Sequence, residues 1–577
     1  MSAHTTSETQ NVAGLRTPAN LVQGTTGLAA RCSNTFQRAR VVADKSLKGL
    51  LIATIIGLVG VTFRMGIESG QVGRFYNSDY GTILYAICAN LSQEKYRAGR
   101  YVCANSAERQ MRDAGLWYTD DALARAGKTL PQWEADGAFL NQALTKVFAS
   151  SPLASDGGVY DYGWGGDSGY MDFVQGAFLL FGTRLEALYY GYFFLLSVST
   201  ILFCIQFWRN YFAAFTVLAF QFSFIAYLDL GYLQPTELGS LGNPRILSLL
   251  AIIPMFHALF LIVYRIRFGL RAGLLFVPQA LLIAAAADFR ALSYAAFITL
   301  LICNVALLVI DRRRQTLREA GRRYWPTYAI AVCLAVGAGL QAATADPRIA
   351  QMGGMRYHTF WEPLFWDLET DQADWQAKYR GQFDGATGDD IARVAVQSYR
   401  ARHGLLNVKN DFVGGNESLG MTRVAYEKYT RDAYIEFARA NPWFIVRLKY
   451  FNALNIMAWV KPLLLNEWRA LHWWLYVLAA FVGFALIAEV RRNVETLRRL
   501  SICAGLVTLS GFLIAIPIWA TAIEGSIMTD LCLLNATASF ALALWVLVSA
   551  GVLVSKLRLP SHSSLRVQVD RAPQRTS

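Results

Sequence analysis

Residues 291–318 read ALSYAAFITLLICNVALLVIDRRRQTLR, an apolar run that ends in a cluster of basic residues. The part from 291 to 310 contains no acidic or basic side chain. A run of about 18 or more such residues is long enough to cross a membrane as a helix. Basic residues gather at the cytoplasmic ends of membrane helices. The stretch therefore predicts a membrane-spanning helix whose C-terminal end faces the cytoplasm.

The composition of the whole chain agrees with a membrane protein. Of its 577 residues, 54% are hydrophobic and only 16% are charged, and the mean hydropathy is +0.30. Water-soluble domains carry more charge on their surfaces. The net charge is +13, but basic residues concentrate beside apolar runs, over 264–271, 311–318 and 490–499. Charge in these places orients membrane helices, so we predict no nucleic acid partner.

Further apolar runs predict an all-α polytopic membrane protein with about ten transmembrane helices and two large extracytoplasmic segments. The predicted spans are 48–66, 186–207, 210–229, 246–265, 272–288, 291–310, 324–344, 470–490, 499–520 and 529–555. With this number of spans, every strongly basic short loop lies on one side of the membrane. Both termini are then cytoplasmic, and we expect the membrane to be a bacterial inner membrane.

The predicted organisation alternates soluble and membrane parts. A disordered cytoplasmic tail over 1–47 precedes the first transmembrane helix at 48–66. The later parts are a first extracytoplasmic loop with an interfacial helix (67–185), a transmembrane bundle (186–344), a second extracytoplasmic segment with an interfacial helix (345–469), the last three transmembrane helices (470–555) and a basic cytoplasmic tail (556–577). External segments of this length usually form functional units of their own.

The two interfacial helices are predicted at 171–186 and 444–465. The second is apolar but is interrupted by Arg447, Lys449 and Lys461. A charge at the centre of a spanning helix costs about 2.5–3.5 kcal/mol on insertion scales. We therefore expect this helix to lie on the outer face, with its cations toward lipid headgroups.

The cysteines give little chemical information. Those in apolar spans are expected to be small core residues: Cys204, Cys303, Cys333 and Cys503. Cys88 and Cys103 form the pair in the first external loop, and their spacing leaves open whether they form a disulfide. The sequence contains no CxxC, HExxH or His/Cys cluster, so no structural zinc site is predicted.

An acidic residue follows the first span at Asp79, after Asn77 and Ser78 and before an apolar stretch. Asp79 is thus expected at the start of a helix, where the helix dipole stabilises an anion. One interpretation is that Asp79 only caps this helix. The other is that it is a catalytic carboxylate just outside the membrane.

The layout resembles the C-type glycosyltransferase (GT-C) superfamily. The shared features are one span, a long external loop that opens with an acidic residue, a bundle of many spans and a later external part. Members use polyprenyl-phosphate-linked sugars and place a catalytic carboxylate in the first external loop, a role that corresponds to Asp79 here. The sequence departs from the common pattern in having Tyr80 after Asp79, where a second acidic residue is often found. This departure leaves both the base and the need for a divalent cation open.

Further candidates for substrate binding lie in the external segments. Asp161, Asp167 and Asp172 occur among glycines and aromatic residues at the end of the first loop. They could supply a metal ligand or orient acceptor hydroxyls, or the stretch could simply anchor the loop at the membrane. Arg245 and Arg290 are cations that could hold the lipid phosphate, or could be ordinary interfacial anchors.

His358 and Trp361 lie in the aromatic stretch YHTFWE at the start of the second external segment. A histidine beside an aromatic ring and a carboxylate suits substrate binding or proton transfer. A packed, hydrogen-bonded histidine explains the same pattern.

The function that the resemblance implies is transfer of a sugar from a polyprenyl-phosphate donor to a cell-envelope glycan or lipid acceptor. The expected partners are that donor, the acceptor and membrane lipids. Alternatives are an O-antigen-like polymerase or ligase, a transporter or flippase, and a receptor or scaffold. Intramembrane charges and paired broken helices, which are typical of transporters, are not evident in the sequence.

Overall fold

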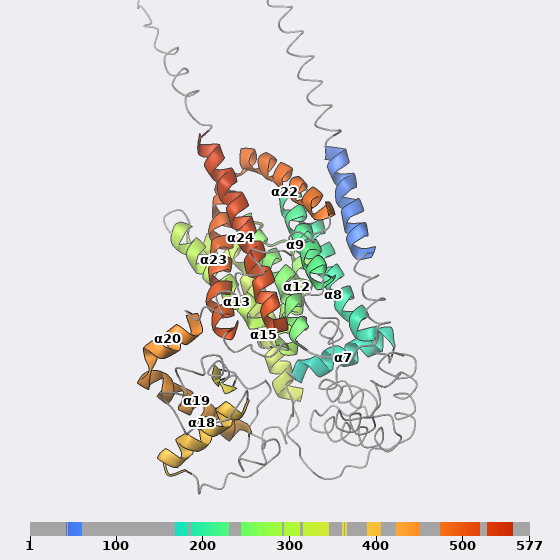
Figure 1. Cartoon of the computed structure of the whole chain (residues 1–577). Coiled ribbons are helices and arrows are strands. Elements are labelled where there is room, and N and C mark those ends of the chain that lie inside the picture. Colours follow the sequence, from blue (N-terminus) through green and yellow to red (C-terminus); the bar gives the residue numbers. More distant parts are fainter. Residues whose placement is uncertain are drawn as a thin grey trace, which may run out of the picture. The chain divides into compact units, whose positions relative to one another are not determined.

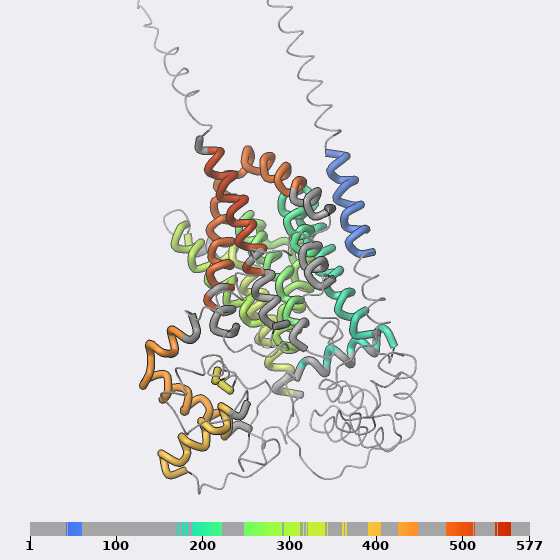
Figure 2. Tube along the Cα trace, viewed as in Figure 1, coloured from blue at the N-terminus to red at the C-terminus, as the bar shows by residue number. Residues whose placement is uncertain are grey.

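The computed structural model describes the helices of this chain. The described residues are 42, 44–60, 168–182, 186–229, 244–290, 293–311, 316–344, 361–362, 364–365, 389–405, 423–450, 473–519 and 528–557 (Figure 2). Throughout these residues the regular structure is helical and no strand occurs. The all-α class predicted from the sequence is therefore confirmed for the described part of the chain.

The chain divides into two units, Met1–Gly57 and Leu58–Ser577. In the first unit residues 44–57 are helical, and Lys48 pairs with Asp44 one turn earlier at 2.5 Å. The predicted disordered tail over 1–47 thus differs at its end, because the helix already begins at residue 44. All remaining helices belong to the second unit.

A bundle of long apolar helices makes up most of the described residues of the second unit (Figure 1). Its members are α8 (Glu186–Gln206), α9 (Tyr211–Asp229), η2 (Pro244–Ala251), α11 (Ile252–Val263), α12 (Leu270–Phe289), α13 (Tyr294–Asp311), α15 (Trp325–Thr344), α22 (Trp473–Arg492), α23 (Val494–Trp519) and α24 (Met528–Leu557). These bounds agree with the predicted spans within a few residues. The main difference is that α23 begins at Val494, so the stretch predicted as a basic loop is helical except for Asn493.

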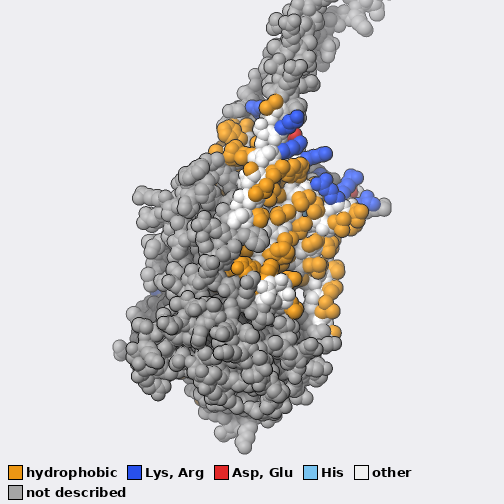
Figure 3. Space-filling view, turned by 90° about the vertical axis from the view of Figure 1, so that its right-hand side faces the viewer, with side chains coloured by type: hydrophobic (Ala, Val, Ile, Leu, Met, Phe, Trp, Pro, Cys, Tyr) orange, Lys and Arg blue, Asp and Glu red, His pale blue; other side chains and the backbone are white. Residues whose placement is uncertain are grey.

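Three helices are long and apolar enough to cross a membrane: Ala187–Gln206, Leu270–Phe289 and Tyr294–Asp311. This result concerns the described residues only. In α13, large apolar side chains such as Val305 and Val309 are exposed, whereas Thr299 and Asn304 are buried. A helix whose exposed face is more apolar than its buried face suits a lipid surrounding. In the coloured part of Figure 3, the exposed side chains are mainly hydrophobic, and Lys and Arg gather toward its upper border.

Helix α11 is the centre of the bundle, because all its residues are buried. It continues η2, a 3₁₀-helix, without a break. At about 2.0 Å per residue in η2 and 1.5 Å in α11, the two together extend about 34 Å. That length matches the hydrocarbon core of a bilayer, which is about 30 Å thick. The predicted span at 246–265 is thus made of two helical types.

Hydrogen bonds between side chains join the bundle helices. Ser199 of α8 donates to Gln279 of α12 at 2.7 Å, and Gln279 donates back to the Ser199 carbonyl at 2.7 Å. Asn304 of α13 donates to Thr327 of α15 at 2.5 Å. Such bonds fix how neighbouring helices are rotated where their outer faces are uniformly apolar.

The bundle has two ends that are named here by their acidic residues. At the Asp288 end, α12 finishes and α13 begins. At the Asp311 end, α13 finishes and α12 begins, and the side chain of Arg271 there donates to the carbonyl of Ile205 in α8 at 3.0 Å. The last residues of α8 therefore lie at the Asp311 end, and so does Arg265, which follows α11 and contacts Asp311. The first residues of α8 and of η2 consequently lie toward the Asp288 end.

A small helical cluster is formed by residues of the second predicted external segment. It contains α18 (Asp389–Arg402), α19 (Arg423–Ala440) and α20 (Pro442–Tyr450). Its buried core is Phe365, Ile391, Ala392, Ala395, Ala433 and Tyr434. Helix α20 covers the first part of the predicted interfacial helix at 444–465, and residues 451–465 lie outside the described residues.

Candidate functional site

The first turns of α7 (Ser168–Phe181) pack against the last turn of α12. Gly169 lies so close to the backbone and carboxyl group of Asp288 that a Cβ atom at this position would overlap both. Four residues later, the ring of Phe173 contacts that of Phe289, with 5.5 Å between their centroids. We call this contact region the α7–α12 junction. Glycine is needed there for close approach between helices.

The junction gathers charged side chains at the Asp288 end of the bundle. Asp172 follows Gly169 by three residues and therefore lies on an adjoining part of the same helix face. Arg290 follows Phe289 as the C-cap of α12, and its N–H donates to the Ala286 carbonyl at 2.9 Å. The side chains of Asp172, Asp288 and Arg290 are all half-buried. Two residues predicted for substrate binding, Asp172 and Arg290, thus belong to elements that meet.

Arg245 lies at the start of η2, toward the same end of the bundle. Helix η2 packs against α12, which carries Asp288 near its end. The backbone of Arg245 therefore lies toward the Asp288 end, and its location on the outer face stays a prediction. The side chain of Arg245 lies outside the described residues.

Trp361 belongs to the small helical cluster. Its ring contacts that of Tyr434, with 6.1 Å between the ring centroids. Its backbone N–H donates to the carboxylate of Glu427 in α19 at 3.2 Å. The neighbouring Glu362 accepts a hydrogen bond from the Tyr426 hydroxyl at 2.8 Å. These contacts attach the 361–365 segment to α19. A role for Trp361 in substrate binding stays a prediction.

Four other predicted residues lie outside the described residues: Asp79, Asp161, Asp167 and His358. The pair Cys88 and Cys103 also lies outside them. Of the cysteines expected in the core, Cys204, Cys303 and Cys503 are buried and Cys333 is half-buried.

Comparisons of the chain with protein-family models, with curated proteins and with solved structures found no match. Among the described residues, no group of three or more His, Cys, Asp or Glu residues is arranged to hold a metal ion. The α7–α12 junction offers carboxylates and a guanidinium group, which can bind hydroxyl groups and a phosphate.

An exposed polar group joins α18 to α19. Glu436 accepts hydrogen bonds from His403 and from Arg402, both at 2.8 Å. These two hydrogen bonds hold the pKa of Glu436 below its usual value, and the one from His403 has the larger effect. The sequence reasoning did not single out this group. Because all three side chains are 40% or more exposed, their ion pairs add little to stability.

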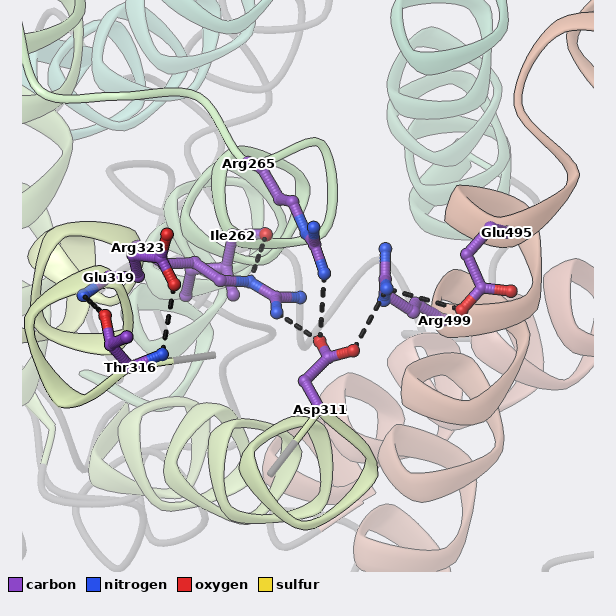
Figure 4. A network of polar contacts seen from close by, with 8 residues as sticks. All are labelled: Ile262, Arg265, Asp311, Thr316, Glu319, Arg323, Glu495 and Arg499. Carbon is purple, nitrogen blue, oxygen red and sulfur yellow. Dashed lines mark hydrogen bonds and ion pairs between the residues drawn. The ribbon is translucent and has the colours of Figure 1, made fainter. Parts of the chain in front are cut away.

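Two buried ionisable residues of the bundle are not among the residues predicted from the sequence. Asp311 belongs to the basic cluster that follows the run 291–310, and it is buried among arginines (Figure 4). His257 lies in the middle of α11 and is fully buried, with Phe203 and Phe276 around its ring. An ionisable residue inside an apolar run is a signal that could have indicated His257, whereas Asp311 lies just after such a run.

Proposed function

We propose that the chain is a membrane glycosyltransferase of the GT-C type. It moves a sugar from a polyprenyl-phosphate donor to a cell-envelope glycan or lipid acceptor on the extracytoplasmic side. The observation that carries the proposal is the α7–α12 junction. It combines Asp172, Asp288 and Arg290 at one end of an apolar bundle, where the phosphate of a lipid-linked donor would lie.

The proposed reaction needs a proton acceptor and a stabiliser for the leaving group. Asp79 accepts the proton of the acceptor hydroxyl while that oxygen bonds to the anomeric carbon of the sugar. The bond between this carbon and the phosphate oxygen breaks, and polyprenyl phosphate leaves with the electron pair. Arg290 balances the negative charge that the phosphate gains. Asp172 orients the acceptor by accepting hydrogen bonds from its hydroxyl groups.

The proposal includes ten transmembrane spans with both termini in the cytoplasm of a bacterial inner membrane. Helices α8, α9, η2 with α11, α12, α13, α15 and α22 to α24 coincide with nine predicted spans, and residues 48–60 of the tenth are helical. The basic residues next to α11, α13 and α22 fall on the side taken as cytoplasmic.

A transfer assay tests the proposed chemistry. Purified full-length protein is incubated with a panel of polyprenyl-phosphate-linked hexoses and pentoses, and release of polyprenyl phosphate is measured. Asp79→Asn should lower the rate at least about 100-fold, because it removes the general base. Asp172→Asn should raise KM several-fold with a smaller effect on kcat, since Asp172 positions the acceptor.

Asp44→Asn is the matched control, because Asp44 pairs with Lys48 far from the α12 segment in sequence and has no part in the proposed reaction. All variants must express and elute as wild type does. Full activity of Asp79→Asn would refute the assignment of the base. A wild-type protein that releases no polyprenyl phosphate from any donor would refute the proposed donor class.

A transporter or flippase is the second candidate, and His257 favours it. An ionisable side chain at the centre of a bundle is typical of proton-coupled transport. In reconstituted vesicles, movement of a labelled lipid that depends on a proton gradient and stops with His257→Leu would support this candidate. Sugar transfer without such movement would support the glycosyltransferase.

A further inference from the structure

Three arginines converge on the buried carboxylate of Asp311 (Figure 4). Arg265 follows the end of α11, Arg323 ends the short helix α14 (Leu317–Arg323), and Arg499 lies in the second turn of α23. Oδ2 of Asp311 accepts from Arg323 and from Arg265, the latter at 3.4 Å, and Oδ1 accepts from Arg499 at 3.0 Å. Segments far apart in the sequence thus meet at one carboxylate.

The buried part of this cluster has more positive than negative charge. The side chains of Arg323 and Arg499 are 4% and 6% exposed, and that of Asp311 is 2% exposed. Glu495 also contacts Arg499, at 3.3 Å, but its side chain is 47% exposed and is therefore screened by water. Among the described ion pairs, two buried guanidinium groups contact this one buried carboxylate.

The cluster also contains buried donors that the described residues leave without acceptors. Nε of Arg499 has no hydrogen-bond partner among them. The hydroxyl group of Tyr324 has none either, and the Tyr324 ring lies 5.4 Å from the guanidinium carbon of Arg323. A buried donor without an acceptor costs about 1–3 kcal/mol. An anion with several oxygen atoms would remove this cost.

The backbone of Arg265 adopts a conformation that favours glycine, so the presence of arginine here indicates a role for its side chain. Arg265 has φ = 55°, in the left-handed region. The N–H of Ile266 donates to the Leu261 carbonyl at 2.9 Å and that of Arg265 to the Ile262 carbonyl at 3.2 Å, as in a Schellman motif. Glycine is the usual residue at this position, and a larger residue costs about 1 kcal/mol. The Arg265 side chain, 45% exposed, connects the buried cluster with the surroundings of the bundle.

We propose that Arg265, Arg323 and Arg499 form a binding site for a phosphate group at the Asp311 end of the bundle. The apolar part of α13 ends at Asp311, so the cluster lies where the headgroups of a bilayer would be. A guanidinium group can bind a phosphate through two parallel hydrogen bonds. Basic pockets between membrane helices bind anionic lipid headgroups. The phosphate belongs to a lipid headgroup or is free in solution. This site is separate from the α7–α12 junction and does not depend on the proposed reaction.

Thermal unfolding of the purified full chain in a nonionic detergent tests the site. One series adds inorganic phosphate at constant ionic strength, with chloride as the balancing anion. The other adds phosphatidylglycerol to the micelles, with phosphatidylcholine as the reference. We expect the unfolding temperature to rise with at least one of these probes. A rise with phosphate alone identifies a free anion as the ligand, and a rise with phosphatidylglycerol alone identifies a headgroup.

Variants of two nearby arginines distinguish binding at a specific site from nonspecific attraction between the protein and the anion. Arg265→Gly relieves the backbone, so it should fold as wild type does, yet bind the active probe about tenfold more weakly. Arg267→Gly removes the same charge two residues later, where the structure shows no contact with Asp311 among its described hydrogen bonds and ion pairs. Its affinity should remain within about twofold of wild type.

Asp311→Asn provides a second measurement, because it removes the carboxylate that competes with the bound anion. Its affinity for the active probe should exceed that of wild type. The proposal is overturned if neither probe stabilises the wild-type protein, or if Arg265→Gly and Arg267→Gly weaken binding equally. In that case the arginines only hold α11, α13, α14 and α23 together around Asp311.

Discussion

At the scale of single residues, Asp311 carries a charge that its own helix disfavours. Asp311 is the last residue of α13, where the helix dipole disfavours a carboxylate. The guanidinium group of Arg499, in the second turn of α23, contacts this carboxylate at 3.0 Å. Asp311 is therefore stabilised by a tertiary contact and not by α13 itself.

His257 illustrates the cost of a polar group inside the bundle. Neither ring nitrogen has a hydrogen-bond partner among the described residues, and the rings of Phe203, Phe207 and Phe276 pack around it. Replacing it with leucine, which has a similar volume, should raise the free energy of unfolding by about 1–2 kcal/mol. Chemical denaturation of the purified protein in detergent measures the change.

Phe256→Leu is the control for this prediction, because Phe256 is buried next to His257 on the same helix. It should lower the free energy of unfolding by about 1 kcal/mol, since it leaves a small cavity. If His257→Leu is destabilising as well, the imidazole has a partner, such as a buried water, and a role in transport gains support.

At the scale of elements, α7 approaches α12 because glycine occupies the contact position. Gly169→Ala should lower the free energy of unfolding by about 1–3 kcal/mol, because a Cβ atom would overlap the backbone of Asp288. It should also lower the transfer rate, since the junction carries Asp172 and Arg290. Unfolding and transfer assays on the same preparation measure both effects.

Gly176→Ala is the matched control on the same helix. No atom lies within 4 Å of a Cβ atom at that position, so the substitution only improves helix propensity. It should raise the free energy of unfolding by up to about 1 kcal/mol and leave transfer unchanged. If Gly169→Ala and Gly176→Ala change the free energy of unfolding and the transfer rate equally, the close approach of α7 to α12 contributes to neither stability nor transfer.

At the scale of the whole molecule, the described helices expose many apolar side chains and bury several hydrogen-bonded polar ones. Ser199, Gln279, Asn304 and Thr327 bond between helices, while apolar side chains of α12 and α13 are exposed. A water-soluble bundle has the opposite distribution, because its polar side chains face the solvent. The described helices are therefore suited to a lipid surrounding.

Reporter fusions test the ten-span topology of the whole chain. Green fluorescent protein fused after residue 557 should fluoresce, because an even number of spans returns the chain to the cytoplasm. Alkaline phosphatase fused after residue 405 should be active, since seven spans precede it and it folds only outside. Phosphatase activity after residue 557 would show an odd number of spans and refute the predicted topology.

The sequence by itself determined the helical class and the positions of most helices. Long apolar runs and the basic residues beside them are local signals, and a helix satisfies its own backbone in lipid wherever its neighbours lie. For this reason α12, α13 and α15 begin and end within a few residues of the prediction. The start of α23 was wrong by five residues, because charged residues continue the helix past the apolar run.

Only the tertiary structure decided which side chains meet. Asp311 and Arg499 are 188 residues apart, and neither has a local pattern that indicates the other. Gly169 and Asp288 come together only because α7 packs across the end of α12. Such contacts depend on how the helices are rotated and packed, because each joins two residues that are distant in the sequence. Helix periodicity does not indicate those pairs, so the sequence could name Asp172 and Arg290 as candidates, but only packing shows that their helices meet.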